Sequence, residues 1–117
     1  MAITDKSDED IIKIVEPMIN NVVTASNQKN WELFSKYQTH EEASDPENKK
    51  NVEKQWRESK FLTSLSLDRN VLGVLRKDSV ALVYWKQTST EVAGEYLASY
   101  QIKEVNNEIR EVGFLLI

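Results

Sequence analysis

The sequence predicts an α+β domain in which three N-terminal helices pack on a curved antiparallel β-meander. From Leu62 to Ile117 the chain reads as four short strands joined by polar turns, with no helical segment long enough to intervene. Helical patterns occur only before that segment. A chain of 117 residues with 40% hydrophobic content and no repeat or flexible linker predicts one domain spanning residues 1–117.

Composition excludes several classes of function. A formal net charge of -4 argues against nucleic-acid binding, and the absence of cysteine removes disulfides and thiolate sites. No apolar run has the ~18 residues that a membrane-spanning helix needs, and the start MAITDKSDED does not resemble a secretory signal. We therefore expect a cytoplasmic protein with no membrane contact and no cofactor.

The first helix is predicted to begin after Ser7, which forms a capping-box-like pair with Asp10. Pro17 interrupts the helical pattern, which predicts a kink or a division of the helix at that point. The apolar stripe that this helix presents for burial comprises Ile11, Val15, Met18 and Val22.

The second helix is predicted to be short and aromatic. Asn30 is a suitable N-cap, and large aromatic side chains then recur at every third position, namely Trp31, Phe34 and Tyr37. The stretch QTHEEASDPENKK that follows is the most polar of the chain and is predicted to form an exposed loop.

The third helix is predicted to begin with Asp45 as N-cap and Pro46 as first helical residue, and to end near Lys60. Val52 and Trp56 form its narrow apolar stripe. Interleaved acidic and basic residues on the remaining surface indicate a solvated face in preference to an anion-binding patch.

Alternating side chains define the strands. The residues expected to share one face in each strand are Leu65, Leu67, Val71 and Leu75, then Val80, Leu82 and Tyr84, then Tyr96, Ala98, Tyr100 and Ile102, then Val112, Phe114 and Leu116. Turns are predicted at 77–79, 88–91 and 106–107. The three glycines, Gly73, Gly94 and Gly113, fall inside these strands and predict bulges or bends.

Both faces of the second strand are apolar, because Ala81, Val83 and Trp85 lie opposite Leu82 and Tyr84. Three helices cover only one face of such a sheet. An uncovered apolar face of several hundred Å² is uncommon on monomers, so we expect a homodimer formed through the sheet. The alternative is that the helix ends or the curl of the sheet cover these residues.

The element order resembles the nuclear transport factor 2-like superfamily, also called SnoaL-like or cystatin-like α+β cones. The matching stretches are DEDIIKIVEPMINNVV, NWELFSKY, ENKKNVEKQWRES, DSVALVYWKQTS and YLASYQIKEVNNEIREVGFLL. The strands are most similar to the association domain of calcium/calmodulin-dependent protein kinase. The resemblance implies dimerisation through the sheet and a pocket between the sheet and the long helix.

Enzymes of this superfamily include ketosteroid isomerases and polyketide cyclases. The resemblance places Asp45, or the nearby His40, where such an enzyme carries its base. The isomerases also carry an acidic donor on the strand before the last turn, where this chain has Ser99 and Tyr100. Tyr100 would then be the donor of a small lyase or isomerase, while Asp45 also fits a purely structural role as a helix cap.

Two further sets of side chains have the chemistry of binding sites. His40, Glu41, Glu42 and Asp45 have the ligand types of a divalent-metal site, but a solvated loop explains them better, so no metal is expected. The residues expected to line a ligand pocket are Trp56, Tyr84, Lys86, Tyr96 and Tyr100, although each aromatic ring also fits the core. The sequence thus favours a noncatalytic dimeric module that binds a small apolar or weakly acidic ligand, or another protein, over a lyase or isomerase.

Overall fold

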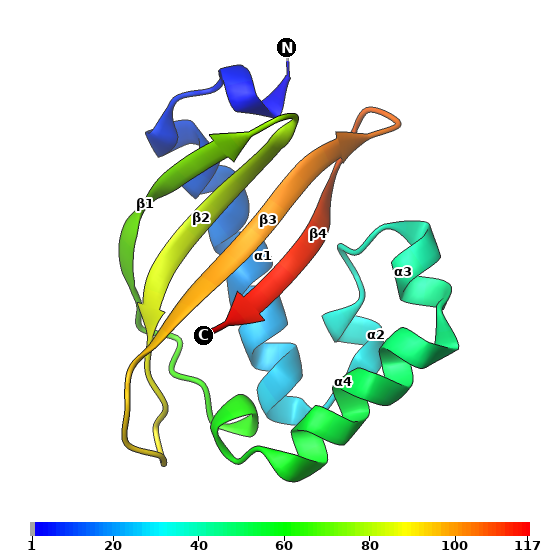
Figure 1. The fold of residues 1–117 in the computed structure, drawn as a ribbon, viewed down its shortest axis with the longest axis vertical. Helices are drawn as coiled ribbons and strands as arrows, with labels where there is room; N and C mark the ends of the chain where they lie inside the picture. Colours follow the sequence, from blue (N-terminus) through cyan, green and yellow to red (C-terminus); the bar gives the residue numbers. More distant parts are fainter. Residues whose placement is uncertain (1) are drawn as a thin grey trace.

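The computed structural model describes residues 2–117 and shows an α+β fold, with a four-stranded antiparallel sheet preceded by the helices (Figure 1). The strands lie in the sheet in the order of the chain, β1-β2-β3-β4. The helical elements are η1 (Ile3–Asp5), α1 (Asp8–Gln28), α2 (Trp31–Phe34), α3 (His40–Ser44), α4 (Pro46–Glu58) and η2 (Phe61–Thr63). The strands are β1 (Asn70–Lys77), β2 (Val80–Gln87), β3 (Tyr96–Val105) and β4 (Glu108–Leu116).

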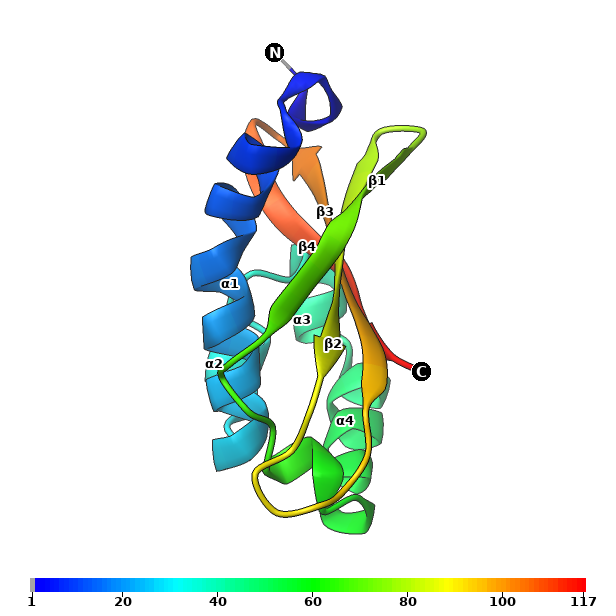
Figure 2. The same cartoon turned by 90° about the vertical axis from the view of Figure 1, so that its left-hand side faces the viewer.

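The helices lie on one side of the sheet. Helix α1 runs along the face that points away from the viewer in Figure 1, and the shorter helices gather beside β4. Figure 2 shows the same arrangement from the edge, with the opposite face of the sheet bare in the part of the chain that the structure describes. The fully buried core lies between α1 and the centre of β2 and β3.

Helix α1 begins as predicted. The Ser7 hydroxyl accepts a hydrogen bond of 3.1 Å from the Asp10 amide and caps the helix. The helix continues through Pro17 as one element, so of the two predicted alternatives, a kink or a division, the division is wrong. Its apolar stripe is buried as expected, because Ile11, Val15 and Val22 are at most 1% exposed.

The Asn30 cap of α2 is confirmed, because its side chain accepts from the Leu33 amide at 3.1 Å. The polar stretch after α2 is not only a loop, however, because it contains α3. The Thr39 hydroxyl caps this helix by accepting from the Glu42 amide at 3.3 Å. Pro46 then ends it, since the residue before a proline is disfavoured in helical conformation.

Helix α4 begins as predicted, with Pro46 as its first residue and the Asp45 side chain accepting from the Glu47 amide at 2.9 Å. Trp56 is 5% exposed and its indole N–H donates to the Ser26 hydroxyl at 3.1 Å. This bond ties α4 to the C-terminal part of α1. Val52, the other residue of the predicted stripe, is half-buried.

The first strand begins later than predicted. Leu65 is buried, but it makes only an isolated bridge to Ser89, and β1 starts at Asn70. The side chain of Asn27 donates to the Leu65 carbonyl at 2.9 Å and accepts from the Leu65 amide at 2.7 Å. Because these bonds satisfy both backbone groups, the segment needs no neighbouring strand at this point.

Two of the three turns follow the prediction, whereas the connection between β2 and β3 spans residues 88–95 and is longer than the predicted 88–91. Asp78 has φ of 56° in the β1–β2 turn, and Asn106 and Asn107 have φ of 53° and 66° in the β3–β4 turn. Residues of this type tolerate the left-handed region best after glycine. Gly94 departs from the prediction: it has φ of 122° in the loop between β2 and β3 and lies outside the strands.

Gly73 and Gly113 lie beside irregularities in the strand register, as their positions predicted. In β4, Gly113 pairs with Gln101 and Glu111 pairs with Ile102, so Val112 is the extra residue of a bulge. The expectation that Val112 shares a face with Phe114 is therefore wrong. Val112 is 37% exposed, whereas Glu111 faces the core and is 6% exposed.

The bare face of the sheet is apolar. The register places Leu75 beside Leu82 in one row and Ser99 beside Leu115 in the next. Leu75 and Leu115 are 56% and 54% exposed. The helices therefore leave this face without a cover, as the pattern of β2 predicted.

Candidate functional site

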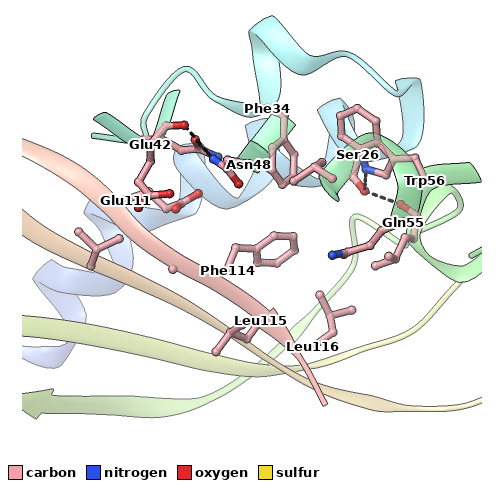
Figure 3. Close-up of a pocket in the computed structure, with 15 residues that line it drawn as sticks. Ser26, Phe34, Glu42, Asn48, Gln55, Trp56, Glu111, Phe114, Leu115 and Leu116 are labelled. Atoms are coloured by element: carbon pink, nitrogen blue, oxygen red, sulfur yellow. Dashed lines mark hydrogen bonds between the residues drawn. The ribbon is translucent and has the colours of Figure 1, made fainter. Parts of the chain in front are cut away.

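A cavity of about 450 Å³ lies between β4 and the helices α2 and α4. Figure 3 shows that its two ends differ in chemistry. Glu42, Asn48 and Glu111 gather at one end, and Ser26, Gln55 and Trp56 lie at the other. Phe34 and Phe114 lie between them, so the cavity is polar at one end and aromatic along its walls.

Glu111 is the buried charged group of the polar end. The bulge at Val112 turns the Glu111 side chain toward the helices. The backbone N–H of Glu111 donates to the Tyr37 carbonyl at 2.7 Å. Glu111 is only 6% exposed as a residue, but its carboxyl oxygens are open to the cavity, because Arg69 Nε is the one fully buried side-chain atom of residues 2–117 without a hydrogen-bond partner. A carboxyl in this position faces the cavity.

Burial raises the pKa of the Glu111 carboxyl to about 7, and the neighbouring charge of Glu42 contributes in the same direction. The group therefore changes its charge near neutral pH. A carboxyl with this pKa can accept or release a proton, and in its ionised form it attracts a cation strongly because little water surrounds it.

The side-chain amides of Asn48 and Gln38 are hydrogen-bonded to each other at the polar end of the cavity. The Asn48 side chain donates to Gln38 Oε1 at 3.1 Å and to the Glu42 carbonyl at 2.9 Å. Gln38 is 6% exposed and forms an isolated parallel bridge with Glu111. These bonds join α4, α3 and β4, so the polar end is fixed by three separate elements.

The aromatic walls are also held by contacts between elements. The Phe34 ring meets the Trp56 ring edge-on, with centroids 5.3 Å apart, and lies 6.3 Å from the Phe114 ring. Phe114 in turn stacks on Trp85 with centroids 6.2 Å apart. The walls are therefore preorganised before any ligand enters.

The predicted pocket residues separate into two groups. Trp56 lines the cavity. Tyr100 is 1% exposed in the core beside Phe114 and does not line the cavity. Burial raises the pKa of its phenol, with further contributions from the charge of Glu111 and from Tyr37.

Tyr84 and Lys86, which were expected to line the same pocket as Trp56, do not line this cavity. Their positions alternate with Trp85, which is 0% exposed on the helix side, so they lie on the bare face. Lys86 forms an ion pair with Glu95 at 3.5 Å. Tyr96 lies at the end of β3, where its ring packs against Phe61 with centroids 4.1 Å apart.

Asp45 and His40, the predicted bases, both lie outside this cavity. Asp45 is exposed and caps α4. His40 is exposed at the start of α3 and lines a second, polar cavity of about 330 Å³ together with Lys36 and Arg110. The two predicted bases therefore do not face the aromatic walls that a proton-transfer site would use.

Residues 2–117 contain neither a metal-binding cluster nor a membrane-spanning helix. No group of three or more His, Cys, Asp or Glu side chains is arranged to hold a metal ion there. In the same part of the chain, no helix combines the length and the apolar character needed to cross a membrane.

Sequence reasoning missed Glu111, Gln38 and Asn48. In the run EIREVGF, simple alternation from Phe114 places Val112 inside and Glu111 outside, and only the bulge reverses this. Gly113 was the available signal, since it marked a bulge but not the side chain that the bulge would turn inward.

Comparisons of the chain with protein families, with curated proteins and with solved structures find no match.

Proposed function

We propose that this protein is a small-molecule-binding domain whose ligand occupies the cavity between β4 and α4. The observation that carries the proposal is the carboxyl of Glu111, a residue that is 6% exposed, lines one end of this cavity and has its pKa raised to about 7 by burial. Burying an ionisable group without a partner lowers stability, and such groups concentrate at functional sites.

The size and the walls of the cavity support the same function. A volume of about 450 Å³ falls within the range of small-molecule sites. Such sites combine apolar walls with a few placed polar groups, and here Phe34, Trp56 and Phe114 supply the walls while Gln38 and Glu111 supply the polar groups.

The resemblance of the sequence to the nuclear transport factor 2-like superfamily supports this proposal, because members of that superfamily keep a pocket between sheet and helices. The order of helices before an antiparallel sheet is compatible with that architecture. We therefore propose that the sheet and the helices form a cone of this type.

We also propose that the protein forms a homodimer through the bare face of its sheet. Apolar side chains occupy the middle of this face, and lysines such as Lys77, Lys86 and Lys103 lie toward its ends. An apolar centre with a charged periphery is the usual composition of a protein interface. A second copy presents the same surface, so the apolar rows of two copies can cover each other.

Acid–base catalysis is the second candidate function, and the pKa of Glu111 favours it. A carboxyl with a pKa of about 7 beside aromatic walls is suited to moving a proton between carbon atoms of a bound substrate. In this reading Glu111, and not Asp45 or His40, is the base of a cofactor-independent isomerase or lyase.

A cavity-filling variant tests the binding function. Val52 lines the cavity and is half-buried, so Val52→Trp should occupy the space of a ligand. Lys50→Trp adds the same ring at an exposed position of α4 outside the cavity and is the matched control. Binding of the neutral probe naphthylmethanol, measured by titration calorimetry, should weaken by about tenfold or more in V52W and stay unchanged in K50W.

Circular dichroism of V52W should confirm that the variant folds. Equal affinity of the wild type and V52W for the probe would show that the probe binds elsewhere and would contradict the proposed site. Native mass spectrometry of gently purified wild-type protein gives a second test, because a discrete additional mass would identify a ligand carried through purification.

A further inference from the structure

The cavity described above carries charge of one sign. Its lining residues include Glu42 and Glu111 and contain no Lys, Arg or His. Glu42 is exposed at the rim, whereas Glu111 is buried. A ligand that enters this cavity therefore meets negative potential that no side chain of the lining neutralises.

No basic side chain of residues 2–117 forms an ion pair with Glu111, so its negative charge is left for a cationic ligand to neutralise. The Glu111 carboxyl oxygens are open to the cavity, and the nearby basic side chains are engaged elsewhere. Arg110 points to the other side of β4, where it forms an ion pair with Glu108 at 2.5 Å and donates to the Lys36 carbonyl at 3.3 Å. Lys36 lies over the Tyr37 ring, 5.2 Å from its centroid.

The polar neighbours of Glu111 also limit which groups a ligand can present. Gln38 Oε1 accepts one hydrogen bond from Asn48 and keeps a second lone pair that can accept from a ligand. A carboxylate or phosphate on the ligand would lie beside two acidic side chains and would be repelled. A group that donates several hydrogen bonds and carries positive charge would satisfy Glu111 and reduce the repulsion from Glu42.

The opposite end and the walls fit the remainder of such a ligand. Phe34, Trp56 and Phe114 present aromatic surface along the cavity, and aromatic faces attract cations as well as apolar groups. A cavity of about 450 Å³ accommodates one or two rings with a short side chain.

We propose that the ligand of this cavity is a small primary or secondary amine with an apolar or aromatic body, whose ammonium group binds Glu111. This inference rests on the proposed binding function and specifies the chemistry of its ligand. The ammonium lies at the end formed by Glu111, Glu42 and Gln38, and the body lies against Phe34 and Trp56.

Other titratable groups face Glu111. They are Glu42 from α3 and Tyr100 from β3, while Tyr37 contacts Glu111 through its backbone carbonyl. Burial raises the pKa of the Tyr100 phenol, so Glu42 is the group of these two that adds charge. Ionised Glu111 predominates above its pKa of about 7, and amine binding should therefore strengthen as the pH rises through that value.

Three probes with one body and different charges test the inference. They are naphthylmethylamine, naphthylmethanol and naphthoic acid, titrated into the full chain by calorimetry near pH 8 and near pH 6. We expect the amine to bind about tenfold or more tightly than the alcohol near pH 8, and the acid to bind more weakly than either. The advantage of the amine should shrink near pH 6, where Glu111 is protonated.

Glu111→Gln removes the charge and keeps the shape of the side chain. This variant should bind the alcohol normally and lose most of the preference for the amine. Glu41→Gln is the control, because Glu41 is exposed on α3 next to Glu42, does not line the cavity, and loses the same charge. It should keep the preference.

The outcomes separate this inference from the function on which it rests. If the alcohol binds in the cavity and the amine binds no more tightly, the amine assignment is overturned and the binding function stands. If E111Q keeps the preference, or E41Q loses it equally, Glu111 is not the group that selects the ligand. If neither probe binds the wild type, both proposals are overturned.

Discussion

The backbone N–H of Glu111 donates a hydrogen bond of 2.7 Å to the carbonyl oxygen of Tyr37, and this bond fastens the edge strand β4 to the segment that leads into α3. The isolated parallel bridge between Gln38 and Glu111 continues the contact. The backbone on both sides of the polar end is thus fixed, and the carboxyl of Glu111 is held in the cavity.

The pH dependence of stability should reveal the buried carboxyl. The pKa of Glu111 is raised from its ordinary value of 4.5 to about 7 in the folded protein. Between these values the unfolded chain has released the proton that the folded chain still holds. The free energy of unfolding that Glu111 contributes is therefore fully present below pH 4.5 and is lost as the pH rises to about 7.

Glu111→Gln should remove this loss. Each pH unit between the two pKa values corresponds to about 1.4 kcal/mol, so E111Q should exceed the wild type by up to roughly 3 kcal/mol near pH 8 and match it near pH 4. Urea unfolding at both pH values measures the difference. A constant difference at all pH values would show that Glu111 titrates normally in the folded protein.

Asp45 should behave as a helix cap and not as a base. Its side chain accepts from the Glu47 amide at 2.9 Å and is exposed outside the cavity. Asp45→Ala should lower the free energy of unfolding by about 1 kcal/mol, and Asp45→Asn should cost only a few tenths because asparagine caps equally well. Both variants should bind cavity ligands as the wild type does.

A loss of affinity for cavity ligands in D45N, at an unchanged free energy of unfolding, would contradict the purely capping role and show that Asp45 takes part in binding.

Tyr100 should contribute packing and not hydrogen bonding. Its ring is 1% exposed beside Phe114, and the residue does not line the cavity. Tyr100→Phe keeps the ring and should change the free energy of unfolding by less than about 0.5 kcal/mol. Calorimetry with naphthylmethanol should give the wild-type affinity, and a clear loss would place the Tyr100 hydroxyl in the binding site.

The sequence allowed most of the fold to be predicted because the determining signals are local. Ser7, Asn30 and Asp45 cap helices through bonds to residues two or three positions away, and Asn106 and Asn107 form their turn without distant partners. Such contacts can be predicted from a few neighbouring residues.

The site could be predicted only in part because its signals are not local. Trp56 follows from helical periodicity, but Glu111 enters the cavity through the bulge at Val112, which changes the alternation of one strand relative to its neighbour. Likewise, the sequence pattern predicts Leu65 to be a strand residue, but its backbone N–H and carbonyl bond to the side chain of Asn27, which is far away in sequence. Neither effect can be recognised from one segment of the chain alone.

The bare face of the sheet provides the last prediction. Leu75 and Leu97 lie on this face and are 56% and 45% exposed, so lysine at either position should be tolerated by a monomer. If two copies pack through this face, L75K/L97K buries charges without partners at the interface and should convert a dimer into a monomer. Light scattering coupled to size-exclusion chromatography at micromolar concentration measures the mass. Leu67→Lys is the control, because Leu67 is 53% exposed but precedes β1, and it should leave the dimer intact. A monomeric wild type under these conditions would refute the proposed dimer, and the apolar face would then be available to a different protein.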